Sequence, residues 1–269
     1  MKHIYKGIIL LLLITGCNDS DKKNQGEMNE AEAVKLRVER GKEILQNSIK
    51  AHGGNRYDAA HYQFIFRDKQ YSFNNQNGYT YSVVAKDSTG SIIVDSLRNG
   101  NFTRRVDNET IALSPKDESK YSNALNSVIY FALLPYKLQD KAVQPTYLGE
   151  TIIAGEDYDV VQVTFGENGG GKDHEDVFCY WINKNSHYMN YMAYSYHTNS
   201  GGVRFRSAYN PRTVDGIRFQ DYVNWEAPLD TSLEDLPQLY ENGLLKELSK
   251  IETEAVQNQE PSPAEGDVQ

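Results

Sequence analysis

A glycine-rich segment in the middle of the chain comes closest to a known ligand-binding motif. Residues 166–172 read GENGGGK, which matches most of the phosphate-binding pattern G-x-x-x-x-G-K. Position 173 is Asp, so a carboxylate replaces the hydroxyl that would hold magnesium. Residues 177–182, which follow, predict a strand and not the helix whose N-terminus would bind an anion. We therefore interpret residues 166–172 as a glycine-rich hairpin loop without a bound nucleotide.

The acidic run after this loop is a candidate metal site. Residues 173–176 read DHED, and a second histidine, His187 or His197, would have to approach His174 from a neighbouring strand. Zinc and similar ions need three or four ligands in a fixed geometry. Neither H-x-x-x-H nor H-E-x-x-H spacing occurs in the chain. We therefore expect a solvated loop, with no metal and no cofactor.

The sequence nominates no catalytic residue. The G-x-S-x-G pattern that presents a nucleophilic serine is absent. Acidic residues are numerous, but their spacing places no pair in a cleft where one would act as acid and the other as base. We expect a protein that is not an enzyme, and a metal-dependent hydrolase that uses the His174 loop is the less favoured alternative.

Aromatic side chains are the strongest sign of a ligand site. The chain contains 19 Tyr and 9 Phe, and many of them lie on predicted strands between residues 177 and 225. Such rings suit a sheet that is packed on both faces, and they equally suit a concave sheet that lines an apolar pocket.

A helix predicted from Ser114 to Leu134 favours the pocket. Ser114 can cap the helix and Pro135 ends it. Residues 128–134 are apolar on all sides, so this part of the helix must be covered on both sides or must face a cavity. The side chains predicted to line the pocket are Val128, Phe131, Leu134, Tyr180, Trp181, Tyr194 and Tyr196.

The N-terminus has the features of an exported lipoprotein. Lys2 and Lys6 precede an apolar stretch, residues 8–14, that is shorter than the roughly 20 residues needed to span a bilayer. Residues 13–17 read LITGC, which resembles a bacterial lipobox with its aliphatic residue, small residues and cysteine. This resemblance implies cleavage before Cys17 and a lipid on Cys17 that anchors the mature chain in a membrane.

Charge and the residue after Cys17 bear on location and partners. Asn18 occupies the position where Asp would retain a Gram-negative lipoprotein in the inner membrane, so we expect the outer membrane, on its periplasmic face or at the surface. A formal net charge of -9 argues against a nucleic-acid partner, because phosphate binding needs a basic face. Cys179 is the other cysteine and has no disulfide partner once Cys17 is acylated, so a packed thiol is predicted.

Local patterns predict both helices and strands. Residues 30–52 show the spacing of a helix with one buried face, and Gly53-Gly54 supplies its end. Residues 61–113 predict a series of strands with tight turns, among them Asn99-Gly100. Residues 147–225 alternate β-branched and aromatic segments with turn residues, which predicts consecutive antiparallel strands in a meander.

The C-terminal part of the chain follows a different pattern. After an interruption at Pro237, apolar residues recur at helical spacing and predict a last amphipathic helix, marked by Tyr240, Leu244, Leu245, Leu248 and Ile251. Residues 253–269 carry no apolar pattern and contain two prolines, so they are expected to be disordered.

The order of these features resembles a family of uncharacterised Gram-negative lipoproteins with a LolA/LolB-like half-barrel. The resemblance spans roughly residues 33–226 and is strongest at residues 149–165, which resemble the strand–glycine–strand hairpin of that family. It implies an α+β fold in which a curved antiparallel sheet is covered by a few helices, with an apolar cavity between them that holds acyl chains. Residues 128–134 would then form part of a lid over the cavity.

The division of the chain follows from the lipobox and this resemblance together. Residues 1–16 are expected to be a lipoprotein signal peptide, 17–29 a flexible tether, 30–252 a single LolA-like half-barrel domain, and 253–269 a disordered tail. The expected function is that of a membrane-anchored envelope lipoprotein that binds a lipid or another apolar ligand. The alternative is a structural or interaction lipoprotein with a solid interior and a protein partner in the envelope.

Overall fold

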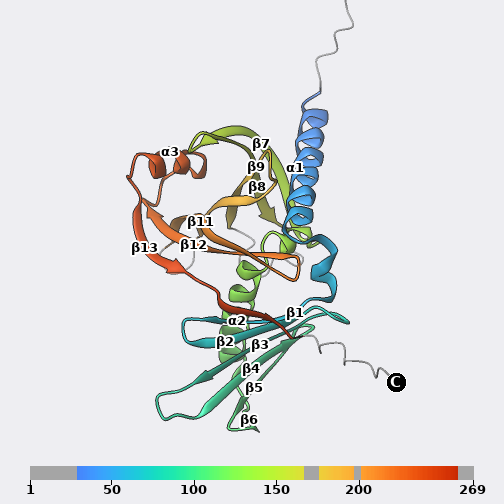
Figure 1. Ribbon diagram of the computed structural model, residues 1–269, viewed down its shortest axis with the longest axis vertical. Coiled ribbons are helices and arrows are strands. Elements are labelled where there is room, and N and C mark those ends of the chain that lie inside the picture. The colour runs from blue at the N-terminus through green and yellow to red at the C-terminus, as the bar shows by residue number, and fades with distance from the viewer. Residues whose placement is uncertain (1–28, 167–175, 197–200, 260–269) are drawn as a thin grey trace, which may run out of the picture.

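Two antiparallel sheets of seven strands each form the protein, one above the other in Figure 1. The computed structural model describes residues 29–166, 176–196 and 201–259. The lower sheet contains β1 (His61–Phe66), β2 (Lys69–Asn74), β3 (Thr80–Lys86), β4 (Ile92–Arg98), β5 (Asn101–Val106), β6 (Glu109–Thr110) and β14 (Glu254–Asn258). The upper sheet contains β7 (Val143–Ile153), β8 (Glu156–Phe165), β9 (Val177–Asn183), β10 (Met189–Tyr196), β11 (Gly202–Val214), β12 (Ile217–Ala227) and β13 (Lys246–Ile251). The helices are α1 (Glu30–His52), α2 (Pro115–Ala132) and α3 (Leu236–Glu241).

Tight hairpins connect most of the strands. Their turns place pairs of residues at positive φ, as at Asn99 (46°) and Gly100 (87°), which is the two-residue turn that matches the twist of the flanking strands. In the upper sheet β7 to β12 pair in chain order, so the predicted meander is confirmed. The predicted α+β class, with curved antiparallel sheets and few helices, is also confirmed, and the strands divide between two sheets.

Both faces of the upper sheet are buried. Side chains alternate along each strand, so neighbouring residues are buried on opposite faces. Tyr180 lies in a cluster with residues of α1 and the end of α2, whereas its neighbour Trp181 lies in a cluster on the other face with residues of α3. Cys179 shares the face of Trp181 and is fully buried, and burial raises the pKa of its thiol to about 12. The prediction of a packed thiol at Cys179 is therefore confirmed.

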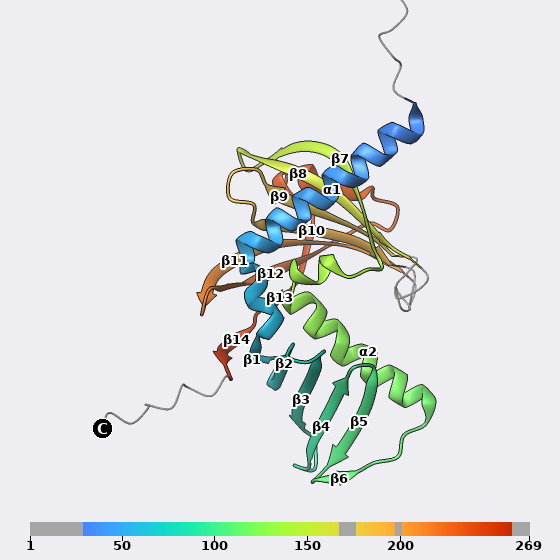
Figure 2. The same cartoon turned by 90° about the vertical axis from the view of Figure 1, so that its right-hand side faces the viewer.

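Helix α2 lies between the two sheets, as Figures 1 and 2 show. Its N-terminus is capped as predicted, because the Ser114 hydroxyl accepts a hydrogen bond from the backbone N–H of Asp117 at 3.2 Å. Towards its C-terminal end one side, with Leu125, Ile129 and Leu133, packs on the lower sheet. The other side, with Tyr130, Phe131 and Leu134, packs on the upper sheet. Burial between two sheets therefore explains a helix end that is apolar on all sides.

Helix α1 crosses the edge of the upper sheet at β7 (Figure 2). Gly41 makes the close approach, because a Cβ added there would lie 3.2 Å from the backbone nitrogen of Tyr147 and 3.3 Å from Cβ of Pro145. His52 at the end of the helix is fully buried, and its Nε2 accepts a hydrogen bond from the backbone N–H of Met189 at 3.1 Å. One ring nitrogen is therefore paired, whereas Nδ1 is buried without a hydrogen-bond partner among the described residues.

The predicted helix over residues 240–251 is wrong. Helix α3 ends at Glu241 because Gly243 adopts a left-handed φ of 65°, and the N–H of Leu244 bonds to the carbonyl of Leu239 at 2.9 Å. Residues 246–251 then form β13, which pairs with β12. In this strand Ile251 faces the interior cluster, whereas Leu248 is 39% exposed, so the apolar residues did not share one helical face.

The prediction that residues 253–269 are disordered is wrong for residues 254–258. Residues 254–258 form β14, which pairs with β1 at the edge of the lower sheet, and residues 260–269 lie outside the described part of the chain. Strands β13 and β14 are consecutive, so one extended segment passes from the edge of the upper sheet to the edge of the lower sheet (Figure 1). This segment joins the two sheets.

Buried polar contacts hold the joint between β13 and β14. The carboxylate of Asp221 on β12 accepts a hydrogen bond from the backbone N–H of Thr253 at 2.9 Å and one from Asn210 Nδ2 at 2.7 Å. Arg212 forms an ion pair with Asp221 at 3.0 Å and also donates to the carbonyl of Thr253. Because Asp221 is almost fully buried, these bonds fix where the segment bends from one sheet to the other.

Candidate functional site

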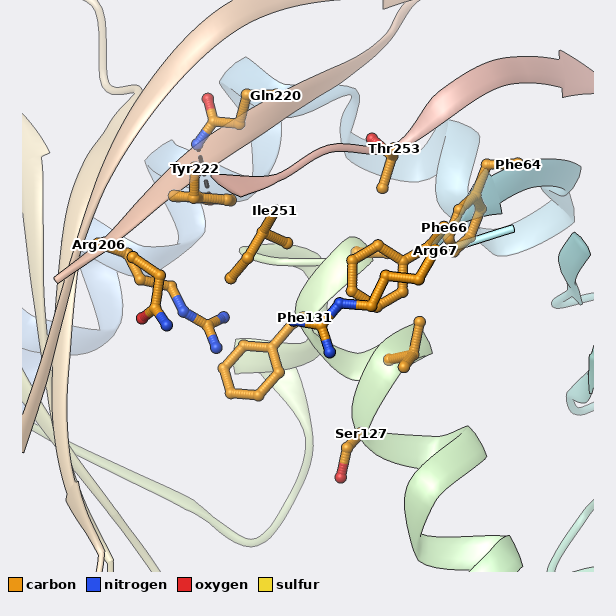
Figure 3. A pocket seen from close by; sticks show the side chains of 13 residues that line it. Phe64, Phe66, Arg67, Ser127, Phe131, Arg206, Gln220, Tyr222, Ile251 and Thr253 are labelled. Atoms are coloured by element: carbon orange, nitrogen blue, oxygen red, sulfur yellow. Dashed lines mark hydrogen bonds between the residues drawn. The ribbon is translucent and has the colours of Figure 1, made fainter. Parts of the chain in front are cut away.

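A cavity of about 220 Å³ lies where α2 meets both sheets and the joint between them (Figure 3). Its apolar wall is contributed by Phe64, Phe66, Val128, Phe131, Ala132, Tyr222 and Ile251. Its polar wall is contributed by Arg67, Ser127, Arg206, Gln220, Asn224 and Thr253. An apolar enclosure with a few inward polar groups is the usual composition of a small-molecule site.

Two polar side chains of β12, Gln220 and Tyr222, are fixed by hydrogen bonds. Gln220 Nε2 donates to the carbonyl of Met189 at 2.7 Å and to the hydroxyl of Tyr222 at 2.7 Å, the second bond being visible in Figure 3. Burial raises the pKa of Tyr222 to about 12, although the Gln220 bond and the charge of Arg206 act in the opposite direction. Tyr222 is therefore a neutral wall residue at neutral pH.

Arg206 is the buried cation of the site. It lies on β11, is only 7% exposed, and donates from Nη2 to the hydroxyl of Tyr194 at 3.0 Å. Its guanidinium carbon lies 4.2 Å from the ring centre of Phe131 and 5.2 Å from that of Tyr194. These aromatic contacts stabilise the charge, and no carboxylate of the described residues forms an ion pair with it.

The predicted lining residues fall into three groups. Val128 and Phe131 on α2 line the cavity. Leu134 and Tyr180 are buried in the upper-sheet cluster that also contains Tyr222, but neither lines the cavity. Trp181 lies on the opposite face of the upper sheet, because adjacent residues of a strand point to opposite faces, so it cannot share a pocket with Tyr180.

The two predicted tyrosines of β10 each accept a hydrogen bond from an arginine of β11. Tyr194 accepts the hydrogen bond from Arg206 described above. Tyr196 accepts a hydrogen bond from Nη2 of Arg204 at 2.9 Å, and its ring lies 6.0 Å from that of Tyr194. Neither tyrosine lines the cavity itself, and only Tyr194 contacts a residue of the cavity wall, Arg206.

Sequence reasoning missed the polar wall and the contribution of the lower sheet. The alternation of β11 carries the missing signal, because Arg204 and Arg206 alternate with the apolar Val203 and Phe205 and must therefore share a face. That two cations interrupt an otherwise aromatic concave face is readable from the sequence. Phe64 of the lower sheet also lines the cavity, but this depends on how the two sheets pack together, which the sequence pattern does not show.

The other candidate motifs lie mainly outside the described residues. These include the glycine-rich loop after Gly166, the run 173–175, His197 and the lipobox cysteine Cys17. The strands on either side of the loop, β8 and β9, pair directly, and β9 is the strand predicted after the motif. Among the residues that the structure describes, no group of three His, Cys, Asp or Glu side chains is placed to hold a metal. Within the same residues no helix combines the length and the apolar character required to cross a bilayer.

Fold and site together define an α+β protein in which two curved antiparallel sheets and a helix between them border a cavity with one apolar and one polar wall. The chain belongs to DUF6503, a family of unknown function, whose model matches residues 33–253. The prediction of an uncharacterised family is therefore confirmed. A comparison with curated proteins finds no match.

The solved structures to which this chain is similar include three bacterial proteins. One is a provisionally assigned outer membrane lipoprotein-sorting protein domain from Vibrio parahaemolyticus, with 12% identity, a TM-score of 0.45, and coverage of 84% of this chain and 95% of that one. A LolA superfamily protein from Nitrosomonas europaea has 11% identity, a TM-score of 0.44, and coverage of 71% and 87%. A DUF1329 family protein from Desulfovibrio piger has 12% identity, a TM-score of 0.40, and coverage of 71% and 86%.

Proposed function

We propose that this protein is a lipid-anchored envelope protein of the outer membrane that binds a lipid or another apolar ligand in the cavity between its sheets. The cavity carries the proposal, because apolar side chains from both sheets and α2 line one wall of it and leave the space between them unfilled. Its volume of about 220 Å³ lies above the roughly 150 Å³ of an engineered cavity that binds benzene. The space therefore suits one short chain or the end of a longer one.

The N-terminal sequence supports the membrane part of the proposal. Residues 13–17 fit a lipobox, and acylation of Cys17 would hold the folded domain at a membrane surface through residues 18–29. A ligand bound in the cavity and the lipid anchor on Cys17 are separate features. A substitution can therefore remove the anchor without removing the ligand, and the reverse.

The test uses the mature chain, residues 17–269, with Cys17→Ser so that its own lipid is absent. The protein is purified without detergent and denatured, and the extract is analysed by mass spectrometry for apolar compounds. Ala132→Phe places a ring in the cavity wall on α2, whereas Ala124→Phe makes the same change at an exposed position of that helix. We expect a stoichiometric apolar compound with the Cys17→Ser protein and with Ala124→Phe, and about tenfold less with Ala132→Phe.

Two results would contradict this function. The first is a folded Cys17→Ser protein that carries no apolar compound and binds none added to it. The second is an Ala132→Phe variant that retains the compound at the level of Ala124→Phe. A cooperative thermal transition of each variant shows that the fold is intact.

A further inference from the structure

The charge of Arg206 has no counter-charge within the described protein. Of the ion pairs formed among residues 29–166, 176–196 and 201–259, none includes Arg206. Its Nε is buried and has no hydrogen-bond partner. Removing a cation from water is unfavourable unless an anion or several acceptors replace the water. One hydroxyl, on Tyr194, and two rings replace it here.

A second unsatisfied group lies directly across the strand pair. Asn224 on β12 is the register partner of Arg206 on β11, and its Oδ1 is buried without a partner. Both residues line the cavity. A side-chain amide can present either its oxygen or its nitrogen after a half-turn. The pair therefore offers two adjacent groups that a polar ligand atom would satisfy.

The neighbouring arginine shows what a compensated cation looks like on the same strand. Arg204 lies two residues before Arg206 and therefore on the same face. It forms an ion pair with Glu226 at 3.3 Å and does not line the cavity. Strand β11 thus carries Arg204 and Arg212, each paired with a carboxylate, and Arg206, which faces the cavity and forms no ion pair with the described residues.

The cavity wall as a whole is positive. It contains Arg206 and Arg67 and no acidic residue, although the chain carries a net charge of -9. Arg67 occupies a two-residue turn with Asp68 at φ values of 48° and 59°, a conformation that usually belongs to Asn or Gly. Figure 3 shows the guanidinium groups of Arg67 and Arg206 pointing towards Phe131 from opposite walls.

We propose that the cavity takes an amphiphile with one acyl chain and a monoanionic head group, and that the head group pairs with Arg206. This inference rests on the proposed function, because it names the class of the apolar ligand. The head group would receive charge-assisted hydrogen bonds from the guanidinium, and the chain would lie against Phe64, Val128 and Ile251. A cavity of about 220 Å³ is below the roughly 300–1,000 Å³ of most ligand pockets, which favours one chain over two.

The test compares head groups on one chain length. The mature Cys17→Ser protein is stripped of bound compounds, and calorimetry at pH 7.5 measures binding of dodecanoate, 1-dodecanol and dodecyltrimethylammonium. We expect dodecanoate to bind at least tenfold more tightly than dodecanol, and the cation most weakly, as a charged hydrogen bond in a buried site implies. A C12 lysophosphatidylglycerol, which is also monoanionic, distinguishes a phospholipid head group from a free fatty acid as the source of the anion.

Variants assign the preference to one side chain. Arg206→Met removes the charge and keeps much of the volume, so the advantage of dodecanoate over dodecanol should fall to within about threefold. Arg204→Met is the matched control, because Glu226 retains Lys246 as a partner at 3.5 Å, and it should keep the full preference. If Arg206→Met does not fold, the head-group comparison on the Cys17→Ser protein still tests whether the cavity prefers an anionic head group.

The outcomes separate this inference from the function on which it rests. Equal binding of all three C12 compounds refutes the anionic head group and leaves apolar binding intact. Undiminished preference for dodecanoate in folded Arg206→Met refutes the role of Arg206. Failure of every C12 compound to bind refutes the inference and the proposed function together.

Discussion

Protonation of His52 is expected to destabilise the fold at mildly acidic pH. Burial, and then the nearby charge of Arg218, lowers the pKa of His52 from 6.5 to about 3. Arg218 is held close by, 3.8 Å above the ring of Tyr188, which itself packs edge-on against His52 at 5.5 Å. The folded protein therefore keeps this imidazole neutral at a pH where the unfolded chain protonates it.

The sign and size of the effect follow from proton linkage. Because the unfolded state binds the proton more readily, the contribution to stability is complete above pH 6.5 and is lost as the pH falls towards 3. At pH 5 the solution is about 1.5 pH units below the pKa of the imidazole in the unfolded chain. Protonation of the unfolded chain then lowers the free energy of unfolding by about 2 kcal/mol. This figure hardly changes for any folded-state pKa below about 4, because the imidazole in the folded protein is then still neutral at pH 5.

Urea unfolding at pH 8 and pH 5 measures the loss, and His52→Gln is the reference. Glutamine does not titrate, and its amide oxygen can accept the hydrogen bond from Met189. We expect the free energy of unfolding to fall by about 2 kcal/mol more in the wild-type protein than in His52→Gln, because carboxylate titration is common to both. Parallel losses, within about 0.5 kcal/mol, would refute the reasoning, since they would mean that His52 protonates without unfolding.

Two further predictions concern the anchor and helix α1. Metabolic labelling with a radioactive fatty acid should mark the wild-type protein and not Cys17→Ser, and label on the variant would exclude Cys17 as the acceptor. Gly41→Leu should lower the free energy of unfolding by about 1–3 kcal/mol, because its side chain would meet the backbone of Tyr147. Lys42→Leu, at the exposed neighbouring position, should change it by less than about 0.5 kcal/mol in the same urea titration.

Local sequence patterns correctly predicted the elements that depend on interactions between residues close in sequence. The cap at Ser114, the turn at Asn99-Gly100 and the meander of β7 to β12 depend on residues close in sequence, and all three were predicted. Strand β13 was predicted as a helix because its apolar spacing also fits one. Its pairing with β12 joins residues that are twenty or more positions apart, and such a contact outweighs a weak helical pattern.

The same distinction applies to the site. Val128 and Phe131 could be predicted, because a helix end without a polar face must be buried on more than one side. The sheets that bury this helix end could not be predicted, since the sequence does not show that the strands divide into two sheets. Trp181 was chosen for its ring, although its position next to Tyr180 on one strand already places the two on opposite faces.

The cavity depends on the joint between the sheets. Ile251 ends β13 and Thr253 precedes β14, and both line the cavity where the segment leaves one sheet for the other. Side chains from two sheets that diverge at this bend cannot interdigitate fully, so space remains between them and α2. Asp221 holds the bend through Thr253, and it lies on the strand that also carries Tyr222 and Asn224 of the cavity wall. The contacts that join the sheets therefore also set the width of the space that Arg206 faces.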